Sequence, residues 1–152
     1  MGDYRRKKMK TVTVETYKSD KYYSNIVKAT AAILSERDEI RPIDVFIKMS
    51  LLSIEDLEKW HSGKIPYLEK AIKCNLSKAA RILRILRMHA HDLDMEPRVV
   101  DYWKNNSKKA TLRFSKMNNA KVEEAYKRHF LIVGSRDRFI ERNREIMTFY
   151  SE

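Results

Sequence analysis

A regularly spaced set of basic side chains is the first feature of this sequence that could do chemistry. At 3.6 residues per turn these side chains fall on one side of a helix. The run Ser77 to Asp94 contains them: Lys78, Arg81, Arg84, Arg87 and His91. Because a guanidinium group donates two parallel hydrogen bonds to a phosphate, this spacing predicts a helix face that binds phosphate groups.

The opposite side of the same helix is apolar. Its members share a face at helical spacing and should pack into a core: Ala79, Ile82, Leu83, Leu86, Ala90 and Leu93. Ser77 is the expected N-cap, since its hydroxyl can accept a hydrogen bond from a free amide of the first turn. We therefore expect the basic side chains to point outward.

The charge of the chain is concentrated in its middle. The net charge is +11, and residues 61–120 hold 13 basic and five acidic side chains. A localised positive field attracts polyanions, nucleic acid first and anionic membranes second. Two other interpretations remain open: the charge serves solubility alone, or the arginines pair with Glu123, Glu124 or Glu141.

A second basic surface is predicted after this helix. Residues 98–115 alternate around the turn-forming cluster Asn105 to Lys108, which is typical of a β-hairpin. Its exposed basic side chains would be Lys104, Lys108, Lys109, Arg113 and Lys116. Tyr102 and Trp103 lie among these charges. They could stack on unpaired bases, or they could pack over the core.

The remaining periodicity predicts a mainly α (α+β) fold with a helical cluster, the hairpin and C-terminal helices. Residues 1–10 form a basic arm, 11–133 the helical domain and 134–152 a C-terminal helix packed on it. Thr11 to Tyr17 alternates like a short strand. Further helices are expected from Asp20 to Glu36, after Pro42, over 54–61, 67–74 and 120–130, and from Arg136 to Tyr150.

Residues 42–76 resemble the Cro/C1-type helix-turn-helix family of DNA-binding domains. The resemblance rests on one run of residues: Ser53, Leu57, Trp60, Gly63, Lys64, Pro66, Leu68 and Leu76. It implies a helix-turn-helix core and duplex DNA as the target. The helix 54–61 carries Glu55, Asp56 and Glu58, which phosphates repel, so we expect the helix at 77–94 to contact the DNA instead.

No catalytic or cofactor motif is present in the sequence. His89 and His91 point about 200° apart on a helix and cannot hold one metal ion together. We therefore expect no enzyme activity, no metal and no cofactor, and keep a metal-dependent nuclease as a third alternative. A lone Cys74 and the lack of a 20-residue apolar run favour a cytoplasmic protein that does not enter a membrane.

The resulting hypothesis is a non-catalytic protein that binds nucleic acid, DNA in preference to RNA, through the basic helix and hairpin. The alternative is a small adaptor or inhibitor subunit whose arginine face docks on an acidic surface of a protein partner. The residue pattern does not determine the oligomeric state.

Overall fold

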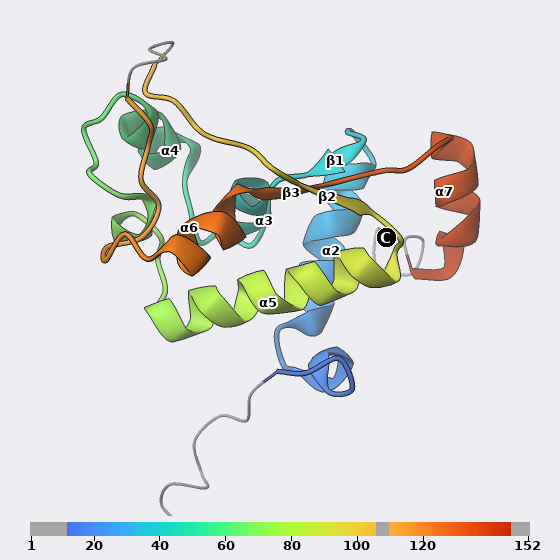
Figure 1. Ribbon diagram of the computed structural model, residues 1–152. Coiled ribbons are helices and arrows are strands. Elements are labelled where there is room, and N and C mark those ends of the chain that lie inside the picture. Colours follow the sequence, from blue (N-terminus) through green and yellow to red (C-terminus); the bar gives the residue numbers. More distant parts are fainter. Residues whose placement is uncertain (1–11, 106–109, 147–152) are drawn as a thin grey trace, which may run out of the picture.

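The computed structural model describes residues 12–105 and 110–146 and shows a mainly α fold with a small antiparallel sheet (Figure 1), so the predicted mainly α (α+β) class is confirmed. In chain order the elements are η1 (Tyr17–Ser19), α2 (Tyr23–Leu34), β1 (Glu39–Ile40), α3 (Pro42–Lys48), α4 (Ile54–His61), η2 (Leu68–Lys70), α5 (Leu76–Asp92), β2 (Glu96–Val99), α6 (Ala120–Lys127), β3 (Arg128–Leu131) and α7 (Arg136–Arg142). The predicted basic arm, residues 1–10, lies outside the described residues.

The sheet has the order β1-β3-β2, and both pairings are antiparallel. Glu39 of β1 and Glu96 of β2 both pair with Leu131 of β3, one on each side. The helix expected over 120–130 ends at Lys127, and the apolar run that begins at its end follows as β3. The structure makes it the central strand, because Phe130 is buried in the core while its backbone joins both neighbours.

The core lies where α2, α3 and α5 pack together. Trp60 of α4 is fully buried, and its indole Nε1 donates to the carbonyl oxygen of Arg113 at 2.8 Å. The ring of Phe114 lies between Trp60, 4.8 Å away, and Tyr126, 5.3 Å away. These aromatic contacts join α4 and α6 to the segment that precedes α6.

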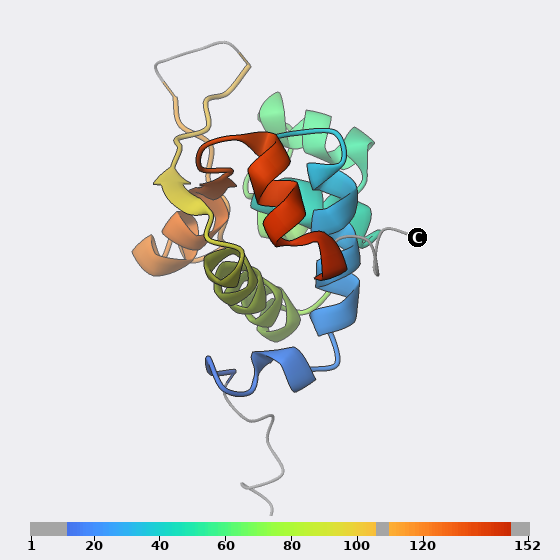
Figure 2. The same cartoon turned by 90° about the vertical axis from the view of Figure 1, so that its right-hand side faces the viewer.

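The C-terminal helix packs on the same core. Phe139 of α7 is fully buried. Arg136, at its first turn, donates to the carbonyl oxygen of Arg37 at 3.0 Å and forms an ion pair with Asp38. These contacts place the beginning of α7 beside the end of α2, as Figure 2 shows from the side.

Side-chain caps begin several helices where the sequence indicates them. Ser53 accepts from the amide of Asp56 at 3.0 Å, and Asn119 accepts from the amides of Lys121 and Val122. The cap of α5 differs from the prediction: Asn75, and not Ser77, accepts from the amide of Lys78 at 2.8 Å. The helix therefore begins one residue before the predicted cap, at Leu76.

Two predicted elements are wrong. Residues 12–16 form a turn in place of the expected strand, because the amide of Thr13 donates to the hydroxyl of Thr16 and the amide of Thr16 donates to the carbonyl of Thr13. The expected helix over 67–74 is reduced to η2. The amide of Lys73, which an α-helix would pair with the carbonyl of Glu69, donates instead to the carbonyl of Leu51 at 2.8 Å.

The predicted hairpin at 98–115 is present only in part. Its two arms meet at one bridge between Trp103 and Thr111, next to hydrogen bonds from Lys104 to Ala110 and from Leu112 to Tyr102. The first arm does not extend this pairing, because β2 pairs with β3 instead. The first arm therefore leaves the sheet and reaches the end of α4, where the amide of Asn105 donates to the carbonyl of His61 at 3.0 Å.

Candidate nucleic-acid interface

Helix α5 presents the basic face that its sequence predicts. Its buried residues are Ala79, Ile82, Leu83, Ile85, Leu86, His89 and Ala90. Arg84, Arg87 and His91 are exposed on the other side. The side chains of Arg84 and Arg87 form no hydrogen bond or ion pair with any residue in the described part of the chain. Their guanidinium groups are therefore available to a ligand.

Arg81 is not available in this way. Its guanidinium Nε contacts the Asp20 carboxylate in an ion pair whose side chains are 17% and 3% exposed, respectively. The predicted site residue Arg81 is therefore a structural residue that holds the beginning of α2 on α5. Sequence spacing alone could not separate it from Arg84, because the difference comes from a partner 61 residues away.

The acidic residues proposed as partners of the arginines are engaged elsewhere. The buried Glu123 carboxylate accepts from the amides of Phe114 and Ser115 and from the Ser115 hydroxyl. Glu124 forms an ion pair with Arg128 at 2.7 Å, and Glu141 with Arg144 at 2.8 Å. The α5 arginines therefore keep their positive charge uncompensated by these carboxylates.

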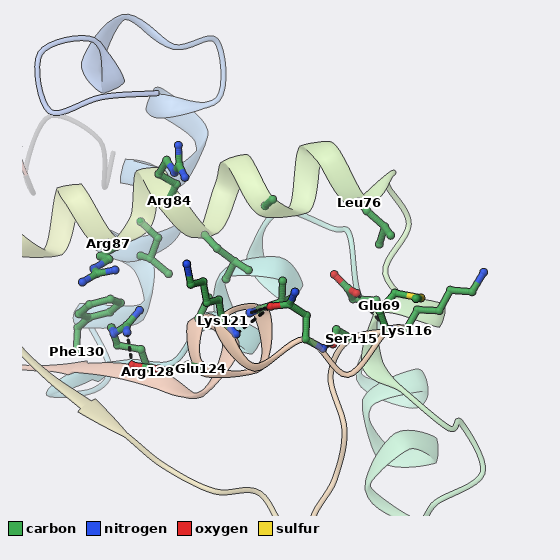
Figure 3. A pocket seen from close by; sticks show the side chains of 17 residues that line it. Glu69, Leu76, Arg84, Arg87, Ser115, Lys116, Lys121, Glu124, Arg128 and Phe130 are labelled. Carbon is green, nitrogen blue, oxygen red and sulfur yellow. Dashed lines mark hydrogen bonds and ion pairs between the residues drawn. The ribbon is translucent and has the colours of Figure 1, made fainter. Parts of the chain in front are cut away.

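A groove of about 750 Å³ lies between α5 and α6 (Figure 3). Arg87 and Arg128 approach Phe130 from either side, and Lys121 lies over the middle of the groove. Arg84 extends outward from α5, and Lys116 lies at the far end, beside Leu76. In all, five basic and two acidic side chains line the groove: Arg84, Arg87, Lys116, Lys121 and Arg128 with Glu69 and Glu124.

A second, smaller hollow of about 390 Å³ is lined by three lysines from three different helices, Lys28 of α2, Lys48 of α3 and Lys78 of α5, and by no carboxylate. The ammonium group of Lys78 lies 5.0 Å from the ring centre of Tyr22, which holds it at the edge of the hollow. Positive charge therefore continues from α5 onto α2 and α3.

The structure does not bring all the predicted site residues together. Lys116 lines the α5–α6 groove, but Lys104 lies against Gly63 at the end of α4, where a Cβ on that glycine would come within 2.5 Å of the Lys104 side chain. Lys108 and Lys109 lie outside the described residues. The hairpin lysine at 104 and the α5 arginines therefore belong to different parts of the surface.

Arg113 is also held by its own neighbours. Its guanidinium group lies over the ring of Tyr67, 5.4 Å from the ring centre, and donates to the carbonyl of Lys116 at 3.1 Å. Its Nε is buried without a hydrogen-bond partner among the described residues. Arg113 thus supports the segment 113–116 more than it presents a free charge.

The two aromatic residues proposed to stack on bases, Tyr102 and Trp103, differ in how far they are buried. Tyr102 packs against Trp60 and Phe114, and its hydroxyl lies 2.6 Å from Nε2 of His129. It is therefore part of the core, which was one of the two alternatives for it. Trp103 is 41% exposed and lies at the bridge with Thr111 that joins the two arms of the hairpin.

The two histidines of α5 occupy opposite environments. His89 is 2% exposed and meets the ring of Tyr23 edge to face at 5.9 Å, while His91 is exposed. Burial lowers the pKa of His89 to about 4, so its imidazole is neutral near pH 7. Within residues 12–105 and 110–146, no group of three or more His, Cys, Asp or Glu side chains is placed to hold a metal ion.

Sequence reasoning missed four basic residues that line the two hollows: Lys28, Lys48, Lys121 and Arg128. They come from α2, α3, α6 and β3, and no local pattern in the sequence links them to α5. Only the packing of these elements around α5 brings them close to its arginines.

Comparisons with protein-family models, curated proteins and solved structures returned no match to this chain. Among the helices that the structure describes, none has the length and apolar character needed to cross a bilayer.

Proposed function

We propose that this protein binds nucleic acid without catalysing a reaction on it, chiefly through phosphate contacts around the exposed face of α5. The observation that carries the proposal is the exposure of Arg84 and Arg87 and the availability of their guanidinium groups. Both are exposed and without a side-chain partner in the described part of the chain, while the nearby carboxylate of Glu124 is already paired. Arginine in this state is suited to bidentate contacts with phosphate oxygens.

The proposed footprint covers both sides of α5. On one side are the basic residues around the groove, and on the other is the lysine-lined hollow: Arg84, Arg87, Lys116, Lys121 and Arg128, with Lys28, Lys48 and Lys78. Each neutralised phosphate releases condensed counterions, so affinity should fall steeply as salt rises. Six to eight contacts would give a slope of about −5 to −7 in log K against log salt.

Duplex DNA is the preferred ligand, on the basis of the helix-turn-helix resemblance at 42–76. In support of it, α3 and α4 are joined by a five-residue turn in which Ser50 has a positive φ of 61°, a conformation that glycine adopts most readily. Glu55 and Glu58 are exposed on α4. Because these carboxylates disfavour entry of α4 into a groove between phosphates, we propose backbone contact through α5 with little sequence preference.

The test is a titration of labelled duplex DNA, single-stranded DNA and RNA with the whole protein at two salt concentrations. Submicromolar duplex binding that weakens steeply between about 50 and 200 mM salt supports the proposal. Weak binding to all three ligands, or binding that does not change with salt, contradicts it. Cleavage of the nucleic acid that requires Mg²⁺ or Mn²⁺ and stops with chelator would replace it with the nuclease alternative.

A further inference from the structure

The floor of the α5–α6 groove has a property that phosphate binding does not use. It is apolar, with Leu83, Leu86, Val122, Ala125 and Phe130 below the basic rim. At one end, the side chains of Leu76 and Met117 are 50% and 79% exposed. Leu83, Leu86 and Phe130 form the buried base of this floor, and Val122 and Ala125 are half-buried above it. Phosphates and sugars gain little from such a surface, whereas an apolar groove with exposed apolar side chains at one end and a polar rim suits a protein ligand.

The dimensions of the groove fit one face of a helix. Leu76 and Arg87, which line its two ends along α5, are 11 residues apart on one helix, or about 16 Å at 1.5 Å per residue. Apolar residues at positions i, i+3, i+4 and i+7 of a bound helix span about 10 Å. The volume of about 750 Å³ is too small for a whole helix and suits a few inserted side chains.

The charge of the rim indicates what should flank those apolar residues. Of the two acidic residues at the groove, Glu124 is paired with Arg128, and Glu69 accepts from the Tyr126 hydroxyl at 2.9 Å and from the Lys116 amide. Arg87 and Lys121 have no side-chain partner in the described part of the chain. An apolar stripe bordered by carboxylates would therefore match this surface, and a basic amphipathic helix would be repelled by it.

We propose that the α5–α6 groove binds an acidic amphipathic helix of a partner protein, whose leucine-like side chains enter the floor while its carboxylates meet Arg87 and Lys121. This goes beyond the proposed function, because it assigns a protein ligand to the groove. Since Arg87 takes part in both surfaces, the helix and nucleic acid compete for the protein. An acidic partner bound here would release the nucleic acid.

The probe is a labelled synthetic helix of about 18 residues, long enough to be partly helical alone, with leucine at i, i+3, i+4 and i+7 and glutamate or aspartate elsewhere. Two control peptides carry the same net charge. One has the same composition with the leucines spread around the helix, and the other has glutamine in place of leucine. Binding to the whole protein is measured by fluorescence anisotropy.

The expected result is that the amphipathic peptide binds at least tenfold more tightly than both controls. The variant Leu76→Ser with Met117→Ser removes exposed apolar side chains and should weaken peptide binding about tenfold, while duplex DNA affinity and the unfolding temperature stay unchanged. Arg87→Glu should weaken the binding of both the peptide and duplex DNA. Duplex DNA should displace the labelled peptide.

Equal binding of the three peptides would show attraction by charge alone and would overturn the proposal. So would absence of binding, or unchanged peptide affinity in the Leu76→Ser, Met117→Ser variant. None of these results depends on nucleic-acid binding, which the titration of duplex DNA measures separately. Failure of the groove proposal is therefore distinguishable from failure of the proposed function.

Discussion

Asp20 and Arg81 form a largely buried ion pair that joins the residues before α2 to the middle of α5. The other carboxylate oxygen of Asp20 accepts from the amide of Tyr22 at 2.9 Å, so one side chain fixes the turn before α2 and joins it to α5. The pair has a second consequence. It engages one arginine of the predicted binding face in packing and leaves Arg84 and Arg87 on the exposed side.

Removing one member of the Asp20–Arg81 ion pair should lower the stability of the folded protein. Asp20→Asn removes the buried carboxylate charge from beside the mostly buried guanidinium group of Arg81, and we expect the free energy of unfolding to fall by about 3 kcal/mol. Urea denaturation measures this loss. The double variant Asp20→Asn, Arg81→Met removes both charges and should recover part of the stability. A single variant as stable as the parent protein would contradict the structural role of the pair.

The buried histidine of α5 should make stability depend on pH. Burial holds the pKa of His89 near 4, below the usual value of about 6.5. As pH falls, the unfolded chain takes up this proton first, so stability is complete above about pH 6.5 and declines down to about pH 4. The expected loss over this window is about 3 kcal/mol.

The variant His89→Met should reduce this pH dependence, as followed by thermal unfolding between pH 7 and pH 4. It should not abolish it, because burial also lowers the pKa of His61 and of His129. His91→Gln is the matched control on the exposed face of the same helix. A pH profile that is identical in His89→Met and the parent protein would show that His89 is not the source.

The Glu123 carboxylate should stabilise the segment at residues 114 and 115, where Ser115 lines the α5–α6 groove. It accepts hydrogen bonds from three donors of residues 114 and 115, and its removal leaves buried donors without partners. Glu123→Ala should therefore lower the free energy of unfolding by about 3 kcal/mol or more. Glu124→Ala, which loses only a surface ion pair with Arg128, should change it by less than about 1 kcal/mol. Equal effects of the two variants would contradict the assignment.

The lysine-lined hollow should contribute to nucleic-acid binding without contributing to stability. Lys28→Gln with Lys48→Gln removes two charges that have no ion-pair partner among the described residues. If both lysines contact phosphates, the slope of log K against log salt should become shallower by about two. An unchanged slope would restrict the interface to the α5–α6 side.

Local signals in the sequence were sufficient for most of the helical fold. Pro42 at the first turn of α3, the caps at Ser53 and Asn119 and the apolar stripe of α5 each indicate a helix through interactions within a few residues. They predicted the fold class and the orientation of α5 for that reason.

The features that sequence reasoning missed are of two kinds, a local turn mistaken for a strand and contacts with partners distant in the sequence. The alternation around Val12 resembles a strand, but Val14 is 70% exposed because two threonines close a turn there. The segment at Leu68 has helical periodicity, but the amide of Lys73 near its end bonds to the carbonyl of Leu51 and not to a carbonyl of the same segment. The candidate interface is of this second kind, since Lys28 and Lys121 reach α5 only through packing.

The most direct test of the central claim is a comparison of two double charge reversals in duplex DNA binding. Arg84→Glu with Arg87→Glu changes the proposed interface, and Lys59→Glu with Lys64→Glu changes the net charge equally at α4, away from α5 (Figure 1). We predict that the arginine variant loses about two units of salt slope and at least tenfold in affinity, while the lysine variant stays within about threefold of the parent. Equal losses in the two variants, or full binding by the arginine variant, would contradict binding through α5.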